Sequence, residues 1–165
     1  MEEDAVDRIL GQWHLERPDL DVSPMGVIGR MGRLAKHLDR SIQETVSEFE
    51  LNLGEFDVLA TLLRSGSPYQ LSPTDLFNAL MVTSGTMTNR IDQLERAALV
   101  RRTPDPHDRR GTLIALTEKG QDLIGQAIEA HVANLHRLVN VLEESERQSL
   151  ALLLRKLVLS FEEKS

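Results

Sequence analysis

The chain has 165 residues, of which 41% are hydrophobic and 27% charged. This length and composition suit one compact domain or the protomer of a small dimer and exclude a disordered or fibrous protein. It contains no cysteine, which excludes disulfides, thiolate nucleophiles and cysteine-based zinc sites. No stretch approaches the roughly 20 consecutive apolar residues of a membrane span, and no secretion signal begins the chain, so we expect a cytoplasmic protein without membrane association.

The net charge of -7 is unevenly distributed along the chain. Residues 83–111 hold six basic against four acidic residues, whereas residues 1–82 hold seven basic against fourteen acidic residues. Affinity for a phosphate backbone depends on local cations, so the basic segment is the expected nucleic-acid surface. A solvated charged face would explain the same excess.

The first half of the chain contains patterns typical of helices. Apolar residues at three- and four-residue steps predict a long amphipathic helix over 24–50. Asn52 as N-cap, with Glu55 three positions later, predicts a second helix that ends near Gly66. A cap, a first-turn proline and an acidic third position predict a short helix over 72–80.

The next helix has one apolar side, and it is followed by a predicted hairpin. Thr83 or Ser84 caps this helix. Its expected buried side consists of Met87, Ile91, Leu94 and Ala98. Two β-like runs, 99–103 and 112–116, flank an eight-residue loop.

Two long helices are predicted to close the chain. Thr117 is the expected N-cap of the first of them, and Ser145 with Gln148 has the spacing of a capping box at the start of the second. Both helices carry narrow apolar stripes with coiled-coil-like spacing.

This order predicts a mainly α fold with a small β-hairpin wing: a winged helix-turn-helix flanked by dimerisation helices. Small hydroxyl and amide side chains suit a helix in the major groove, because they reach base edges without holding the backbone away. Guanidinium groups at a wing tip can enter a narrow groove or pair with phosphates. The expected DNA contacts are Thr83, Ser84, Thr86, Thr88, Asn89, Arg90, Arg109 and Arg110.

Three stretches carry a family resemblance: Leu94–Arg102, the wing Asp105–Arg110, and Leu116–Gly120. Through them the chain resembles the MarR family of bacterial transcription regulators over about residues 25–163. The family wing usually reads Asp-x-Arg-Asp-x-Arg, and His107 stands here at the middle arginine position. The resemblance implies a two-fold dimer with one recognition helix for each half of a palindromic operator.

The resemblance and the apolar stripes together suggest a division of the chain. Residues 1–23 form an N-terminal segment that we expect to be helical. Residues 24–50 and 117–163 form the expected helical dimerisation region, because their apolar stripes need a surface on which to be buried. Residues 51–116 form the expected DNA-binding domain. A monomer with a folded-back helical arm is the alternative.

The segment from Trp13 to Met25 looks like the urate-responsive PecS/HucR branch of the family. That resemblance implies a pocket for an anionic ligand lined by Trp13, Asp57 and Arg90. The branch has an asparagine near the end of the second helix of its winged core, where this chain has Ser65. Alternatively, the tryptophan only anchors a terminal helix, and the aspartate and arginine form a permanent ion pair.

The pocket would explain how DNA binding is regulated. A planar anion such as urate or an aromatic carboxylate can stack on an indole and pair with a guanidinium, which would disturb an Asp57–Arg90 pair between two helices. The expected function is a repressor released by such a ligand. A winged-helix protein without a small-molecule effector is one alternative, and a helical dimer that acts through protein contacts is another.

No motif predicts catalysis or a bound metal or cofactor. The serines and histidines match no nucleophile motif, and there is no glycine-rich phosphate loop. The five histidines include no pair at the i, i+4 spacing of a helical zinc site. We therefore expect neither an enzyme nor a metalloprotein.

Overall fold

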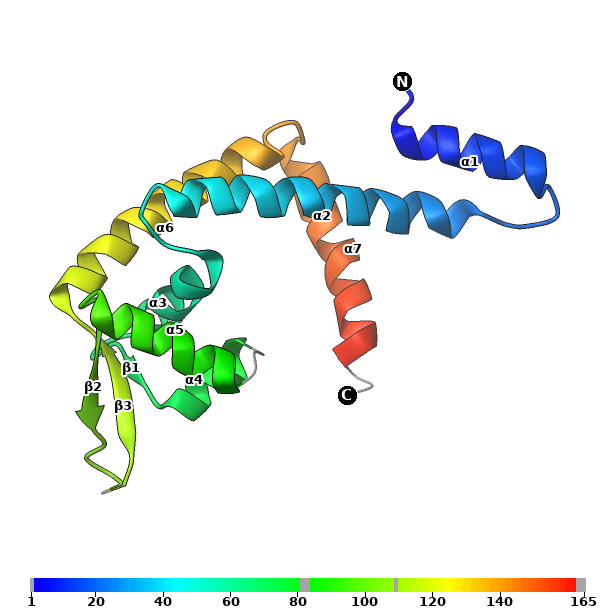
Figure 1. Cartoon of the computed structure of the whole chain (residues 1–165). Coiled ribbons are helices and arrows are strands. Elements are labelled where there is room, and N and C mark those ends of the chain that lie inside the picture. Colours follow the sequence, from blue (N-terminus) through cyan, green and yellow to red (C-terminus); the bar gives the residue numbers. More distant parts are fainter. Residues whose placement is uncertain (1, 81–83, 109, 163–165) are drawn as a thin grey trace. The chain divides into compact units, whose positions relative to one another are not determined.

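The computed structural model describes residues 2–80, 84–108 and 110–162 (Figure 1). Its elements in chain order are α1 (Ala5–Glu16), α2 (Ser23–Ser47), α3 (Leu53–Arg64), β1 (Gln70–Leu71), α4 (Pro73–Leu80), α5 (Ser84–Arg96), β2 (Val100–Pro104), β3 (Thr112–Leu116), α6 (Glu118–Val139) and α7 (Glu144–Glu162). They form two compact units, divided between Glu44 and Thr45. The fold is mainly helical with a small antiparallel sheet, as the sequence predicts.

The N-terminal unit begins with a reciprocal capping box. The Asp4 carboxylate accepts hydrogen bonds from the backbone N–H groups of Val6 and Asp7, at 2.7 and 2.9 Å. The Asp7 carboxylate accepts from the Asp4 N–H at 3.0 Å. These bonds satisfy backbone donors that the first turn of α1 would otherwise leave unpaired.

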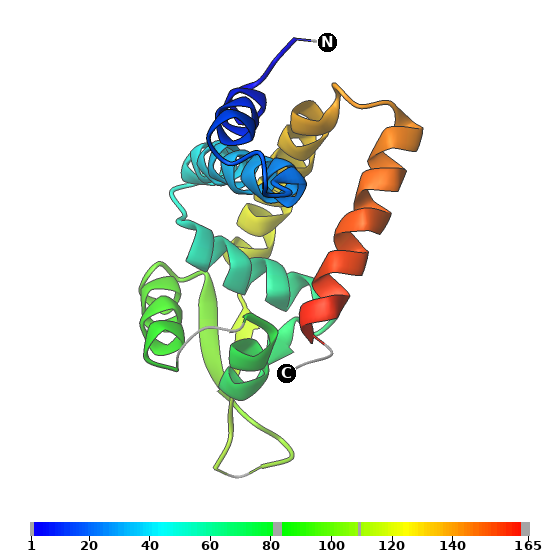
Figure 2. The same ribbon diagram turned by 90° about the vertical axis from the view of Figure 1, so that its right-hand side faces the viewer.

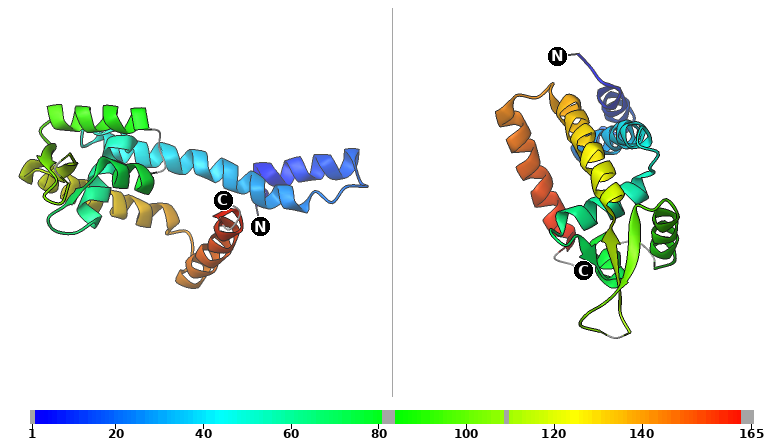
Figure 3. Two further views of the ribbon diagram at one scale, coloured as in Figure 1. Left: turned by 90° about the horizontal axis from the view of Figure 1, so that it is seen from below. Right: turned by 90° about the vertical axis from the view of Figure 1, so that its left-hand side faces the viewer.

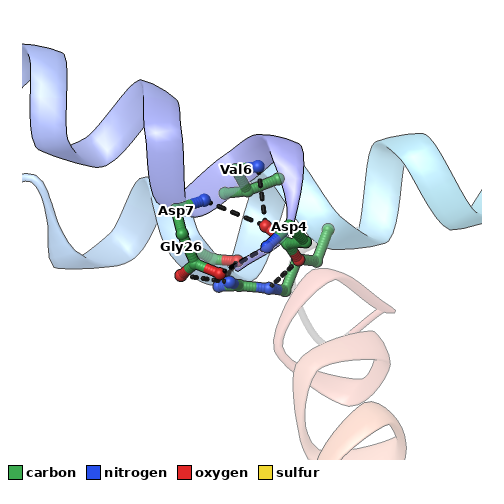
Figure 4. A network of polar contacts seen from close by, with 5 residues as sticks. Asp4, Val6, Asp7 and Gly26 are labelled. Atoms are coloured by element: carbon green, nitrogen blue, oxygen red, sulfur yellow. Dashed lines mark hydrogen bonds and ion pairs between the residues drawn. The ribbon is translucent and has the colours of Figure 1, made fainter. Parts of the chain in front are cut away.

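The same carboxylates tie α1 to α2 (Figure 4). The Arg30 guanidinium donates to Asp4 at 2.8 Å, to Asp7 at 2.6 Å and to the Gly26 carbonyl at 3.2 Å. Backbone hydrogen bonding by Asp7, together with Arg30, lowers the pKa of Asp4 to about 2. Val6 is buried beside this network, so α1 is fixed to α2 by polar and apolar contacts.

The C-terminal unit contains the predicted winged helix-turn-helix. Helix α3 contacts α4, α5 and α6, and α4 and α5 contact each other. The core is aliphatic; its fully buried side chains include Val58, Leu59, Leu62, Leu76, Leu94, Ile114 and Ile124. Figures 2 and 3 show the β2–β3 hairpin extending from the helices, with its turn at the far end.

The sheet has three antiparallel strands in the order β1-β3-β2. In the hairpin Val100 pairs with Leu116 and Arg102 with Ile114. The sequence prediction missed β1, where Gln70 pairs with Ala115. A two-residue strand carries no periodicity of its own, and it exists only because β3 offers it an edge.

The junction between α5, β2 and α6 is tightly packed. Ala98 has a left-handed backbone (φ 58°), and the next residue, Leu99, returns its N–H to the Leu94 carbonyl at 2.9 Å. Thr117, the predicted N-cap of α6, donates its hydroxyl to the Ala98 carbonyl at 2.7 Å and accepts from the Gly120 N–H at 3.0 Å. The α6 cap therefore also closes the end of α5.

Three sequence predictions of local structure are wrong. Ser145 lies inside α7 rather than capping it: the helix begins at Glu144, and the N–H of Glu143, just before it, donates to the Glu146 carboxylate at 2.8 Å. Ala98 is exposed, since it lies beyond the end of α5. The helix predicted over 24–50 ends at Ser47, and the left-handed Glu50 (φ 57°) excludes its continuation.

Within the described ranges, no helix is both long enough and apolar enough to cross a bilayer.

Candidate nucleic-acid interface and ligand site

Helix α5 is buried on one side and polar on the other. Met87, Ile91 and Leu94 are each at most 2% exposed and hold the helix against the core. Thr86, Thr88 and Asn89 are exposed. The helix therefore presents short polar side chains near its N-terminus, which is the arrangement that reads base edges in a major groove.

Two of the predicted DNA contacts, Thr83 and Arg109, lie outside the described residues. Ser84 is the first residue of α5, and its side chain is also outside the description. These three assignments stay predictions.

Arg90 differs from the other predicted contacts on α5. It is half-buried, and its guanidinium lies against Gly54 in the first turn of α3. A Cβ at Gly54 would overlap Arg90 Nε and would be 2.5 Å from Cζ. A side chain at position 54 would therefore displace the guanidinium. The structure thus places Arg90 between α5 and α3.

Asp57 lies one turn further along α3. Removal from water raises the pKa of its carboxyl, against the opposing charges of Arg90, His131 and Arg64. Among the described residues, Asp57 and Arg90 form no ion pair within 4.0 Å. The alternative of a permanent Asp57–Arg90 bridge is therefore not what the structure contains.

His131 of α6 also lies close enough to Asp57 to influence its carboxyl. The sequence did not predict that these two residues meet. The ring centroid of His131 lies 5.1 Å from that of Phe56, and its buried Nδ1 has no hydrogen-bond partner among the described residues. A histidine on an apolar stripe gives no sequence signal that distinguishes this position from an ordinary packing site.

Trp13, the third predicted pocket residue, lies on α1 in the N-terminal unit and is 40% exposed. It is the single tryptophan of the chain. Its grouping with Asp57 and Arg90 stays a prediction.

The wing tip is shaped by two aspartates. Asp105 accepts from the His107 N–H at 2.8 Å, and Asp108 accepts from the Arg110 N–H at 2.9 Å. Gly111 closes the turn, where a Cβ would be 2.9 Å from the Asp105 Cβ. These acidic side chains bind backbone donors of the loop, while the Arg110 side chain is exposed at the tip.

Sequence reasoning also missed a link between the wing and α5. Arg102 of β2 donates through Nη2 to Asp92 at 2.5 Å and through Nη1 to Glu95. Its backbone N–H donates to Glu95 at 3.2 Å. The alternation of β2 could have shown that Arg102 and Val100 share a face, but not which helix that face meets.

No group of three histidine, aspartate or glutamate side chains in the described part of the chain is placed to hold a metal ion.

The chain is similar to several bacterial transcriptional regulators. The chain is 44% identical over 149 residues to the HTH-type transcriptional regulator PecS of Dickeya dadantii, covering 90% of each protein. The chain belongs to the MarR family. The MarR family profile itself matches residues 51–112, the predicted DNA-binding part. The matched relatives place the chain among MarR-family transcriptional regulators rather than enzymes.

Solved MarR-family structures have the same fold. A mutant of Escherichia coli MarR complexed with operator DNA superimposes with a TM-score of 0.69 at 25% identity, covering 94% of this chain and 99% of that one. BpsR of Bordetella bronchiseptica, in a structure on the regulation of its DNA binding by 6-hydroxynicotinic acid, superimposes with a TM-score of 0.69 at 26% identity, covering 80% and 92%.

Proposed function

We propose that this MarR-family regulator is a dimeric repressor that binds a palindromic DNA operator and is released by a small planar anion. The observation that carries the DNA-binding part is the match of the chain to MarR complexed with operator DNA. The exposed polar side of α5 and the arginine-tipped wing supply the two groups of contacts that such a complex needs.

The proposed dimer is supported by apolar side chains that are exposed in the single chain. In the N-terminal unit, α2 exposes Val27, Ile28, Met31 and Leu34. In the C-terminal unit, α7 has no buried residue, and its exposed apolar side chains include Leu150, Leu153, Leu154, Leu157 and Phe161. Surfaces of this kind mark interaction sites, and a second copy of the chain is the proposed partner.

The ligand part is supported by the surroundings of Arg90. Its guanidinium lies beside the first turn of α3, where the helix dipole is positive, and no carboxylate of the described residues pairs with it. A cation at that position attracts an anion. The relative BpsR, whose DNA binding is regulated by 6-hydroxynicotinic acid, supports an aromatic carboxylate as the ligand class; urate, implied by the resemblance to PecS, is the other candidate.

Release follows if binding of the ligand to the Arg90 guanidinium changes how α5 is held against α3. Arg90 lies on the recognition helix and contacts α3, so an anion that draws the guanidinium away from Gly54 changes how α5 is held. The ligand must have a higher affinity for the arrangement that cannot bind DNA than for the arrangement that can. Equal affinity for the two arrangements would shift no population.

The function is tested by electrophoretic retardation of DNA from the upstream region of the protein's own gene. We expect retardation, relieved by urate or by one of several aromatic carboxylates. The site should contain two half-sites about 10 base pairs apart, and scrambling one of them should weaken binding. Retardation that no compound relieves would remove the ligand from the proposal and leave an effector-independent DNA-binding protein.

The pocket is tested separately by the fluorescence of Trp13. We expect the emission to change when the effective anion is added, and Arg90→Ala to abolish the change because the paired cation is lost. Gly54→Ala should weaken ligand binding about tenfold, since its Cβ displaces the guanidinium. Gly125→Ala is the matched control, because a Cβ there meets no atom within 4 Å. Unaltered ligand affinity in both Arg90→Ala and Gly54→Ala would exclude this site.

A further inference from the structure

Helix α5 and the wing are joined by ion pairs. The Arg102 clamp consists of Arg102 on β2 with Asp92 and Glu95 on α5. Its guanidinium binds one carboxylate with each terminal nitrogen, and its backbone N–H binds Glu95 as well. All three side chains are between 37% and 39% exposed. A single arginine therefore fixes β2 to two successive turns of α5.

We propose that the Arg102 clamp is a positioning device that makes α5 and the wing read DNA as one rigid body. The inference rests on the proposed function, because it concerns how operator DNA is distinguished from other DNA. Arg102 is the central residue of β2, between the end of α5 and the wing tip. A small rotation at this position moves the tip, where Arg110 lies, by a larger distance.

Changes in the charge of the clamp distinguish a positioning role of Arg102 from a direct contact with phosphate. Asp92 and Glu95 each accept from one terminal nitrogen of Arg102 and together outweigh its positive charge, so the clamp as a whole is not a simple phosphate-binding cation. Removing the arginine lowers the charge of a protomer by one, and removing both carboxylates raises it by two. If the clamp acts by positioning, both changes impair discrimination between DNA sequences. If charge alone matters, the two changes shift the affinity for DNA in opposite directions.

The experiment compares Arg102→Ala with the double variant Asp92→Asn, Glu95→Gln. Dissociation constants are measured at one salt concentration for the retarded upstream fragment and for a scrambled duplex of equal length and composition. We expect the ratio of the two affinities to fall about tenfold in both variants, because misplaced groups lose base-specific contacts but still meet phosphates. The double variant should bind the scrambled duplex more tightly than the wild type.

Arg101→Ala is the matched control, because it removes the same charge from the adjacent position of β2, and no ion pair of Arg101 is present among the described residues. We expect it to leave the affinity ratio within about twofold of the wild-type ratio. Arg102→Lys keeps the charge but cannot span two carboxylates with a planar fork, so its ratio should fall between those of wild type and Arg102→Ala. Circular dichroism shows whether each variant is folded. If Arg102→Ala is unfolded, Arg102→Lys takes its place in the comparison.

Two results would overturn the clamp. The first is an unchanged affinity ratio in the folded variants. The second is equal weakening on both duplexes by Arg102→Ala with no effect of the double variant, which would make Arg102 a phosphate contact. A wild-type protein that retards neither duplex would instead overturn the proposed function, so the two failures are distinguishable.

Discussion

Replacing Gly120 with alanine is expected to destabilise the C-terminal unit strongly. A Cβ at this position would overlap the Leu99 carbonyl oxygen and would be 3.0 Å from its carbon. That carbonyl cannot simply move, because it accepts hydrogen bonds from both the backbone and the hydroxyl of Thr117, each at 3.1 Å. Overpacking against fixed backbone costs on the order of 3 kcal/mol.

The measurement is thermal unfolding followed by circular dichroism at one protein concentration, since association with a second copy would make the midpoint depend on concentration. For a chain of this size, about 3 kcal/mol lowers the midpoint by roughly 6–12 °C. Gly125→Ala, five residues further along α6, is the control: its Cβ meets no atom within 4 Å, and alanine favours the helix by about 0.5–1 kcal/mol. Equal midpoints for the two variants would contradict the packing of α6 against Leu99.

The affinity for DNA is expected to fall steeply with salt. In the proposed dimer the two predicted wing contacts of each protomer, Arg109 and Arg110, would supply four phosphate-binding cations. Counterion release then predicts a slope of about -4 or steeper in a plot of log affinity against log salt. Raising the salt fourfold should therefore weaken binding on the order of a hundredfold.

The Arg110→Ala variant tests the wing itself. It removes two cations from a dimer, so the slope should become shallower by about 2, and binding should weaken to a similar degree on every DNA sequence. Arg8→Ala, in helix α1, has the same effect on net charge and serves as the control. An affinity that hardly changes with salt would favour the protein-contact alternative, and equal slopes for the two variants would remove the wing from the interface.

The sequence was informative wherever structure depends on neighbours along the chain. The N-cap of α3 at Asn52 and that of α6 at Thr117 were predicted from spacing and are confirmed, because a cap needs only a side-chain acceptor and a backbone donor three residues away. The buried face of α5 at Met87, Ile91 and Leu94 is confirmed for a similar reason, since helical periodicity determines which residues share a face. The predicted cap at Ser145 is wrong because α7 already begins at Glu144, and the Glu146 carboxylate accepts from the N–H of Glu143, which precedes the helix.

By itself, then, the sequence determined the order of helices and hairpin, the polar side of the recognition helix and the basic wing, since each depends on local spacing. Only the tertiary structure decided which distant groups meet. It brought Arg90 onto Gly54, 36 positions earlier in the chain, and Arg102 onto Asp92 and Glu95, and it created β1 by supplying β3 as an edge. Such pairings depend on how elements pack in three dimensions, and periodicity within one element does not contain that information.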